Sequence, residues 1–121
     1  MRQITTHHDG HGLNESITIL VDDTPINGAS HVYEAVMPPA DRHPLHIQFQ
    51  CGPRNVEGSM PGVTEAVLYA ILIDRLEGFQ AGPYPCAANA EQLDALRGCL
   101  ASTKGRADER AARNVLGTYA K

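Results

Sequence analysis

The sequence predicts an α+β protein, with a small antiparallel β-sheet in the N-terminal part and a hairpin of two helices in the C-terminal part. The first half contains short runs of β-branched residues separated by turns rich in proline and glycine, whereas from residue 64 onward apolar residues recur at the spacing of a helix. A group of strands followed by a group of helices is typical of α+β proteins. We therefore expect one domain over residues 1–121, with a β-rich part at 1–58 and a helical hairpin at 62–118.

Three segments of the first half are expected to be strands. Residues 16–21 (SITILV) are rich in β-branched side chains, and residues 31–36 (HVYEAV) follow an Asn-Gly pair that favours a hairpin turn. Residues 45–49 (LHIQF) alternate apolar and polar side chains, so the three apolar ones, Leu45 among them, should lie on one buried face. Together these segments predict a small antiparallel sheet.

Two helices are expected in the second half. The first begins after Thr64, a good N-cap residue, and has Glu65 favourably placed in its first turn. Its apolar residues predict a clean amphipathic helix. The second begins near residue 87, and Gly98 and Gly105 weaken it, so the arginines beyond Gly105 could belong to a short third helix. The residues of the two apolar stripes are Leu68, Ile71, Leu72, Leu76 and Phe79 in the first helix, and Leu93, Leu96 and Leu100 in the second.

The composition favours an oligomer with a mainly aliphatic core. Hydrophobic residues make up 42% of the chain, but aromatic residues make up only 5%, and there is no tryptophan. A small aliphatic core often gains stability when more surface is buried between subunits. The net charge of -4 argues against general binding to nucleic acid or to a membrane surface, since both favour a basic protein.

The cysteines and the apolar segments indicate a cytoplasmic protein. The three cysteines are an odd set without a CxxC motif, which suits reduced thiols better than a disulfide framework. The N-terminal residues do not form the apolar run of a signal peptide. The longest apolar segment, residues 63–76, contains charged residues and is too short to span a bilayer. We therefore expect a soluble protein of the cytoplasm.

The chain from residue 79 to residue 118 has the residue types of a nucleotide-binding site. Arg106, Arg110 and Arg113 have the spacing of one helix face, and guanidinium groups bind phosphate oxygens bidentately. Upstream, Phe79 offers a ring on which a base could stack, and Asn89 offers an amide that could read the edge of the base. The structural alternative is that Phe79 belongs to the core, Asn89 caps a helix and the arginines form a solvated face.

A histidine-rich motif near the N-terminus, HHDGHG, allows another interpretation. His7, His8, Asp9 and His11 could bind zinc or another transition metal, or act as acid and base. Their spacing matches none of the usual helical ligand patterns, and the glycines suggest a tight turn, so structural histidines are the simpler interpretation. There is also no nucleophile elbow, phosphate-binding P-loop or GxGxxG motif. The sequence therefore predicts no catalytic residues, no metal site and no cofactor.

Five segments spread over nearly the whole chain carry a resemblance to a known family. They are HHDGHGLNESI, GASHVYE, IQFQCGPRNVEG, GVTEAVLYAILIDRLEGFQAGPYPCAANA and RADERAARNVLGT, and the run IDRLEGFQAGP is the most specific part. In these segments the chain resembles the phage-encoded Thoeris anti-defence proteins of the first type, which are sponges for nucleotide signals.

The resemblance implies a function without catalysis. Proteins of this family bind cyclic ADP-ribose isomers made by host TIR-domain enzymes and do not degrade them, so the downstream effector is never activated and Thoeris antiphage immunity is blocked. The implied assembly is a homohexamer built from dimers, in the cytoplasm of the infected bacterial host. No DNA, RNA or membrane partner is implied.

The resemblance also implies roles for individual residues. Phe79 would stack on the adenine, and Asn89 would hydrogen-bond the ligand. Arg106 and Arg110 would hold the pyrophosphate and the riboses. The further residues implied to line this pocket are Arg113 and Thr118.

Two additional expectations concern cyclic oligonucleotides and catalysis. Some members of the family also bind the cyclic di- or trinucleotides of CBASS, which implies a second site that includes Arg54, Asn55 and Thr64.

The alternative function is that of a metal-dependent phosphodiesterase or hydrolase, which would act on cyclic nucleotides through the HHDGHG motif.

Overall fold

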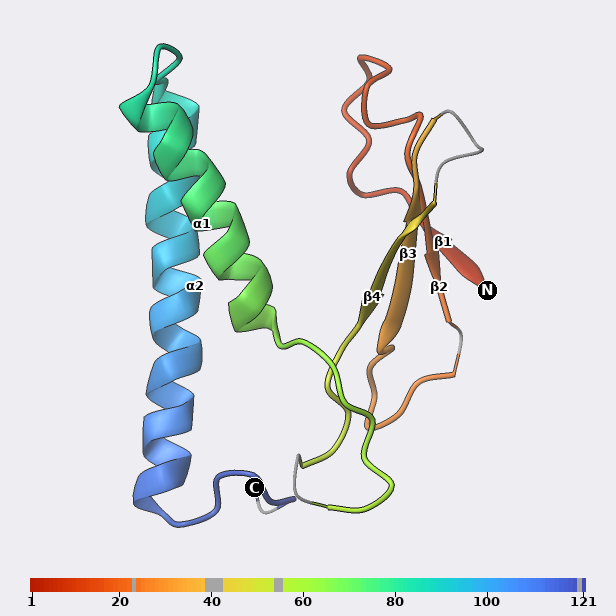
Figure 1. Cartoon of the computed structure of the whole chain (residues 1–121), viewed down its shortest axis with the longest axis vertical. Helices are drawn as coiled ribbons and strands as arrows, with labels where there is room; N and C mark the ends of the chain where they lie inside the picture. The colour runs from red at the N-terminus through yellow and green to blue at the C-terminus, as the bar shows by residue number, and fades with distance from the viewer. Residues whose placement is uncertain (23, 39–42, 54–55, 120) are drawn as a thin grey trace. The chain divides into compact units, whose positions relative to one another are not determined.

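The computed structural model describes residues 1–22, 24–38, 43–53, 56–119 and 121. The chain forms two compact units, Met1–Gly62 and Val63–Lys121, which are drawn in Figure 1. The first unit contains an antiparallel sheet and the second contains two helices, so the expected α+β fold is confirmed. The boundary between the units lies between Gly62 and Val63.

The sheet of the first unit has four strands in the order of the sequence. They are β1 (Arg2–Ile4), β2 (Thr18–Val21), β3 (Val32–Val36) and β4 (Leu45–Gln48), and each is antiparallel to the next. The three expected strands are thus present, and β1 is an additional edge strand that pairs with β2. Its sequence, RQI, is too short to show an alternation of apolar and polar residues.

The apolar face of the sheet is organised around Val21. This side chain is fully buried, and in the register of the sheet it lies opposite Tyr33, which in turn lies opposite Ile47. The Tyr33 ring meets the Phe49 ring edge to face, with 5.6 Å between the ring centroids. The expectation that Leu45 is buried is wrong: its side chain is 52% exposed, since it begins the edge strand β4.

The second unit is a hairpin of α1 (Glu65–Ala81) and α2 (Ala87–Ala112). Its turn is held by the Gln80 side chain, which donates to the Cys86 carbonyl at 3.0 Å and accepts from the Cys86 amide at 2.9 Å. The second helix continues through both of its glycines, so the arginines do not belong to a third helix. Within the described helices, Leu93 is the buried side chain, with 4% exposure.

The first helix is not the amphipathic helix that the sequence predicts. Apolar side chains surround α1 on several sides, and a single partner helix covers only one of them. Val67, Ile71, Leu72 and Phe79 remain between 39% and 59% exposed. The helix therefore has an apolar face that α2 does not cover.

Neither helix of the described chain is both long enough and apolar enough to cross a membrane.

The close approach of Gly62 to the chain around β4 leads to a prediction about stability. A Cβ atom at this position would lie 2.5 Å from the carbonyl carbon of Phe49 and closer still to the carbonyl oxygen of Gln48, and these backbone atoms cannot rotate away. We expect Gly62→Ala to lower the free energy of unfolding by about 1 to 3 kcal/mol, as overpacking usually does. Urea denaturation followed by circular dichroism measures this change.

The matched control is Gly98→Ala, because a Cβ atom at residue 98 would meet no atom within 4 Å apart from the neighbouring backbone of its own helix. This variant should raise the free energy of unfolding by about 0.5 to 1 kcal/mol, the usual difference between alanine and glycine inside a helix. A Gly62→Ala protein as stable as the parent would show that the approach at residue 62 is not tight.

Candidate functional site

The residues expected to bind a nucleotide lie toward opposite ends of the hairpin. Phe79 is in the last turn of α1 and Asn89 is in the first turn of α2, so both lie near the turn between the helices. Arg106 and Arg110 lie near the other end of α2, and Arg113 is its C-cap residue. At 1.5 Å of rise per residue, the backbones of Asn89 and Arg106 are separated by about 25 Å. The hairpin of one chain therefore does not bring the expected residues together in one pocket.

Near the turn, the Phe79 ring already has a cationic neighbour. The guanidinium carbon of Arg75 lies 5.0 Å from the ring centroid, which is within the range of a cation–π contact. The ring is 39% exposed, and Asn89 is half-buried. A base that stacks on Phe79 would need the ring face away from Arg75, or would displace that guanidinium.

At the other end of the hairpin there is a basic cavity between the start of α1 and the last third of α2. Its volume is about 430 Å³, within the range of about 300 to 1,000 Å³ that is usual for small-molecule pockets. We call it the basic cavity; its lining residues are Thr64, Glu65, Ala66, Thr103, Lys104, Arg106 and Ala107. Two of these, Thr64 and Arg106, are candidates from the sequence.

The basic cavity has three features that favour an anion. The first turn of α1 lines it. The Val67 amide donates to the Thr64 carbonyl at 3.1 Å, but the amides of Glu65 and Ala66 have no acceptor within their own helix and carry a partial positive charge. Thr64 is the N-cap residue, but its side chain makes no capping hydrogen bond. Lys104 and Arg106 add two positive charges, against one negative charge from Glu65, and neither makes an ion pair with another described residue.

Arg110 holds the end of the chain. Its Nη2 atom donates to the carbonyl oxygens of Val115 and Thr118, at 3.1 Å in both cases. The Thr118 hydroxyl also donates to the Val115 carbonyl, at 2.6 Å. The structure thus brings together two expected binding residues, Arg110 and Thr118, in contacts that close the turn after α2.

Arg113 forms an ion pair along the helix. Its Nε atom donates to Oε1 of Glu109, one turn earlier, and its Nη2 atom lies 3.3 Å from Oε2 of the same carboxylate. Both side chains are about half exposed. Arg113 is therefore engaged by a neighbour, whereas Arg106 is available at the surface of the basic cavity.

The expected second site is described only in part. Arg54 and Asn55 lie outside the described residues. Thr64 lines the basic cavity together with Arg106, so within the hairpin it lies beside a residue expected in the first site.

The HHDGHG motif forms a loop in which carboxylates bind backbone amides. Oδ1 of Asp9 accepts from the His11 amide at 3.0 Å, and the Glu15 carboxylate accepts from the amides of Gly12 at 2.6 Å and Asp9 at 2.8 Å. The His7 ring nitrogen Nε2 lies 2.7 Å from the Ile17 carbonyl oxygen, which can only accept, so His7 donates this bond. These contacts are those of structural turn residues. Among the described residues, no three His, Cys, Asp or Glu side chains are grouped so that they could hold a metal ion.

One contributor to the basic cavity was not singled out from the sequence. Lys104 is two residues before Arg106, and its basic charge was visible, but its position against the start of α1 depends on how the hairpin packs. No local pattern in the sequence indicates that contact. The combination of an N-cap residue on one helix and basic residues near the end of the other is the signal that could have suggested it.

Comparison with known proteins adds no relative: no protein-family model matches the chain, and no curated protein matches it significantly in sequence.

The loop of the HHDGHG motif should respond to acid through Glu15. The amides of Gly12 and Asp9 hydrogen-bond its carboxylate and lower its pKa from 4.5 to about 2. The folded loop is then favoured fully above pH 4.5, and this contribution disappears as the pH falls toward 2. We expect a carboxyl titration of Glu15, followed by NMR, to have its midpoint near 2.

The matched control for this titration is Glu15→Gln, which removes the charge and keeps one carbonyl acceptor. In that variant the amide resonances of Gly12 and Asp9 should no longer follow a carboxylate titration. A Glu15 midpoint near 4.5 would show that the loop does not bind the carboxylate in solution.

Proposed function

We propose that this protein is a non-catalytic sponge, which binds and sequesters cyclic ADP-ribose isomers made by host TIR-domain enzymes and so blocks Thoeris antiphage immunity in the host cytoplasm. The observation that carries the proposal is the basic cavity, where the start of α1, Lys104 and Arg106 favour a phosphate group. The identity of the ligand comes from the family resemblance in the sequence. The cavity supports the phosphate-binding part of that proposal.

The contacts available in the basic cavity are too few to give the binding affinity that a sponge needs. Sequestration at nanomolar affinity needs about -12 kcal/mol. Hydrogen bonds to charged groups contribute about 1.5 to 3 kcal/mol each, and a stacked base contributes about 1 to 3 kcal/mol, before the entropy of association is subtracted. A tight complex therefore requires that the ligand be enclosed from more than one side.

A second copy of the chain supplies the missing side in this proposal. Phe79 and Asn89 lie about 25 Å along the hairpin from Arg106, too far for a ligand in the basic cavity of the same chain to contact all three. If two hairpins associate in opposite directions, the turn of one lies beside the basic cavity of the other. Val67, Ile71 and Leu72 offer apolar surface for such an association.

The larger assembly and a second ligand class belong to the same proposal. By resemblance, the dimers would assemble into a homohexamer. Cyclic di- or trinucleotides of CBASS would bind at a site that includes Thr64, Arg54 and Asn55. In the HHDGHG motif, hydrolysis would require the Asp9 carboxylate as a ligand or a base, and this carboxylate accepts hydrogen bonds from the His11 amide and the Asn14 side chain instead.

Removal of one charge from the basic cavity should weaken ligand binding. We expect Arg106→Gln to raise the Kd for cyclic ADP-ribose isomers by about 10- to 100-fold, because one charged hydrogen bond contributes about 1.5 to 3 kcal/mol. Isothermal titration calorimetry measures the change. Arg97→Gln is the matched control: it also removes one arginine from α2, but Arg97 pairs with Glu77 and does not line the cavity. An equal loss in both variants would mean that only the overall charge matters.

A sponge must return its ligand unchanged. We expect that cyclic ADP-ribose isomers incubated with the protein, and then released by heat denaturation, will be recovered intact by chromatography. A protein that binds in this way has no turnover, so the recovered amount should equal the amount added at every incubation time. Recovery of a linear product would instead support the hydrolase.

A further inference from the structure

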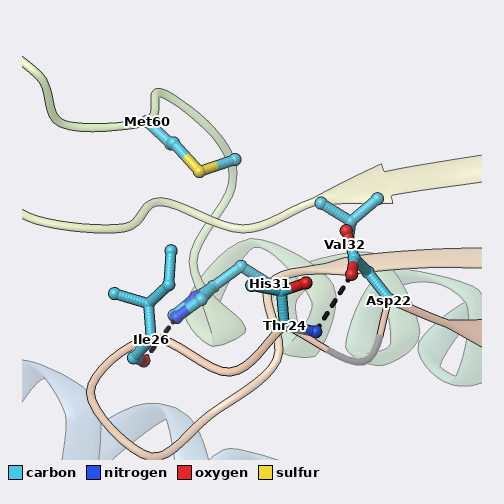
Figure 2. A pocket seen from close by; sticks show the side chains of 6 residues that line it. All are labelled: Asp22, Thr24, Ile26, His31, Val32 and Met60. Atoms are coloured by element: carbon cyan, nitrogen blue, oxygen red, sulfur yellow. Dashed lines mark hydrogen bonds between the residues drawn. The ribbon is translucent and has the colours of Figure 1, made fainter.

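The first unit contains a cavity that is lined by an acidic residue, whereas the basic cavity is lined by basic residues. It lies between the connection from β2 to β3 and the loop that carries Met60, and Figure 2 shows its lining side chains. We call it the acidic cavity; its lining residues are Asp22, Thr24, Ile26, His31, Val32 and Met60. Its volume of about 250 Å³ is slightly below the usual range for drug-sized ligands, so it suits a small molecule.

The walls of the acidic cavity are held by backbone hydrogen bonds. The Asp22 amide donates to the Val32 carbonyl at 3.1 Å, which extends the pairing of β2 and β3. Ile26 pairs with Ala29 around a two-residue turn. Met60 exchanges two hydrogen bonds with Cys51, at 2.8 and 2.9 Å. A ligand would thus meet a cavity that is already formed, which lowers the entropy cost of binding.

The turn beneath the cavity explains how Ile26 and His31 are positioned. Asn27 and Gly28 both have positive φ angles, 56° and 88°, as a tight hairpin turn requires, and these are the residue types that tolerate them. The turn brings the Ile26 carbonyl to 2.9 Å from Nε2 of His31. The imidazole is thereby fixed at the edge of the cavity.

The polar groups of the acidic cavity mainly accept hydrogen bonds. Because a carbonyl oxygen can only accept, the His31 Nε2 atom carries the proton in its bond to Ile26, and in the neutral ring Nδ1 is an acceptor. Among the described residues, the Asp22 carboxylate accepts one bond, from the Thr24 amide to Oδ1 at 3.0 Å, and it makes no ion pair. A carboxylate can accept about four hydrogen bonds, so Asp22 retains a charge and acceptor capacity.

The remaining walls are apolar. Ile26 and Val32 contribute branched aliphatic groups, and Met60 contributes a flexible, polarisable thioether. Such surface gains free energy when an apolar group displaces water from it. The Asp22 carboxylate disfavours an anion, so the nucleotide of the proposed function does not suit this cavity.

We propose that the acidic cavity binds a small organic cation: an ammonium group at Asp22, carried by an apolar body that lies against Ile26, Val32 and Met60. The ammonium donates to the carboxylate, and a second donor can reach Nδ1 of His31. The charge of the ligand and its apolar body are both needed, because an exposed ion pair alone contributes little to affinity. This site lies within the first unit, whereas the basic cavity lies within the second.

Protonated phenethylamine is a suitable probe, with phenylacetate as a probe of similar shape and opposite charge. We expect phenethylamine to shift the NMR resonances of the Met60 methyl group and of Ile26, with saturation in the millimolar range or below, and we expect phenylacetate to leave them unchanged. Equal shifts with both probes, or no saturable shift with phenethylamine, would overturn the proposal.

The decisive variant is Asp22→Asn, which keeps an oxygen for the Thr24 amide and removes the charge. We expect it to weaken phenethylamine binding by at least about tenfold, a loss of about 1.4 kcal/mol. Glu34→Gln is the control, because it removes the same charge from β3, at a residue that does not line the cavity. Unchanged affinity in Asp22→Asn, or the same loss in Glu34→Gln, would contradict a site at Asp22.

Discussion

The amount of apolar surface that the hairpin buries depends on how much of α1 a single partner helix can cover. The packing of α1 on α2 buries Leu93 to 4% exposure, and it leaves four large apolar side chains of α1 at 39% or more. Two helices alone bury only the surface where they meet, so the sequence of α1, which is apolar on several sides, suits a helix with neighbours on more than one side. The expected binding residues lie toward the two ends of this hairpin, because α2 is one continuous helix and a ligand cannot bring its two ends together.

The two cavities are lined by groups of opposite charge. The basic cavity combines the positive end of a helix with Lys104 and Arg106, whereas the acidic cavity combines a carboxylate with hydrogen-bond acceptors. The chain has a net charge of -4, so the proposed attraction for a phosphate cannot come from the protein as a whole. It must come from the local arrangement at the start of α1, where backbone amides and side chains act over a few ångströms.

Much of the fold could be predicted because its signals are local. The β-branched runs, the Asn-Gly turn and the leucine spacing each depend on residues close in sequence, and these predicted three strands and both helices. The exposure of Leu45 and the uncovered face of α1 were not predicted, because they depend on which elements are neighbours in space. The basic cavity is a similar case: Thr64 and Arg106 were both candidates, but they come to line the same cavity only when the hairpin closes.

The arginines of α2 show how one residue type in one pattern acquires different roles. Arg113 is neutralised by Glu109, and Arg106 faces the basic cavity without an ion pair among the described residues. Arg110 uses Nη2 to hold the carbonyls of residues 115 and 118, and both edges of the guanidinium that can bind an anion bidentately, Nε with Nη2 and Nη1 with Nη2, include this nitrogen. A phosphate that binds Arg110 bidentately would therefore compete with the chain end for Nη2. The fold of that chain end and the affinity for a phosphate at Arg110 would then be linked, since the same planar group orients both.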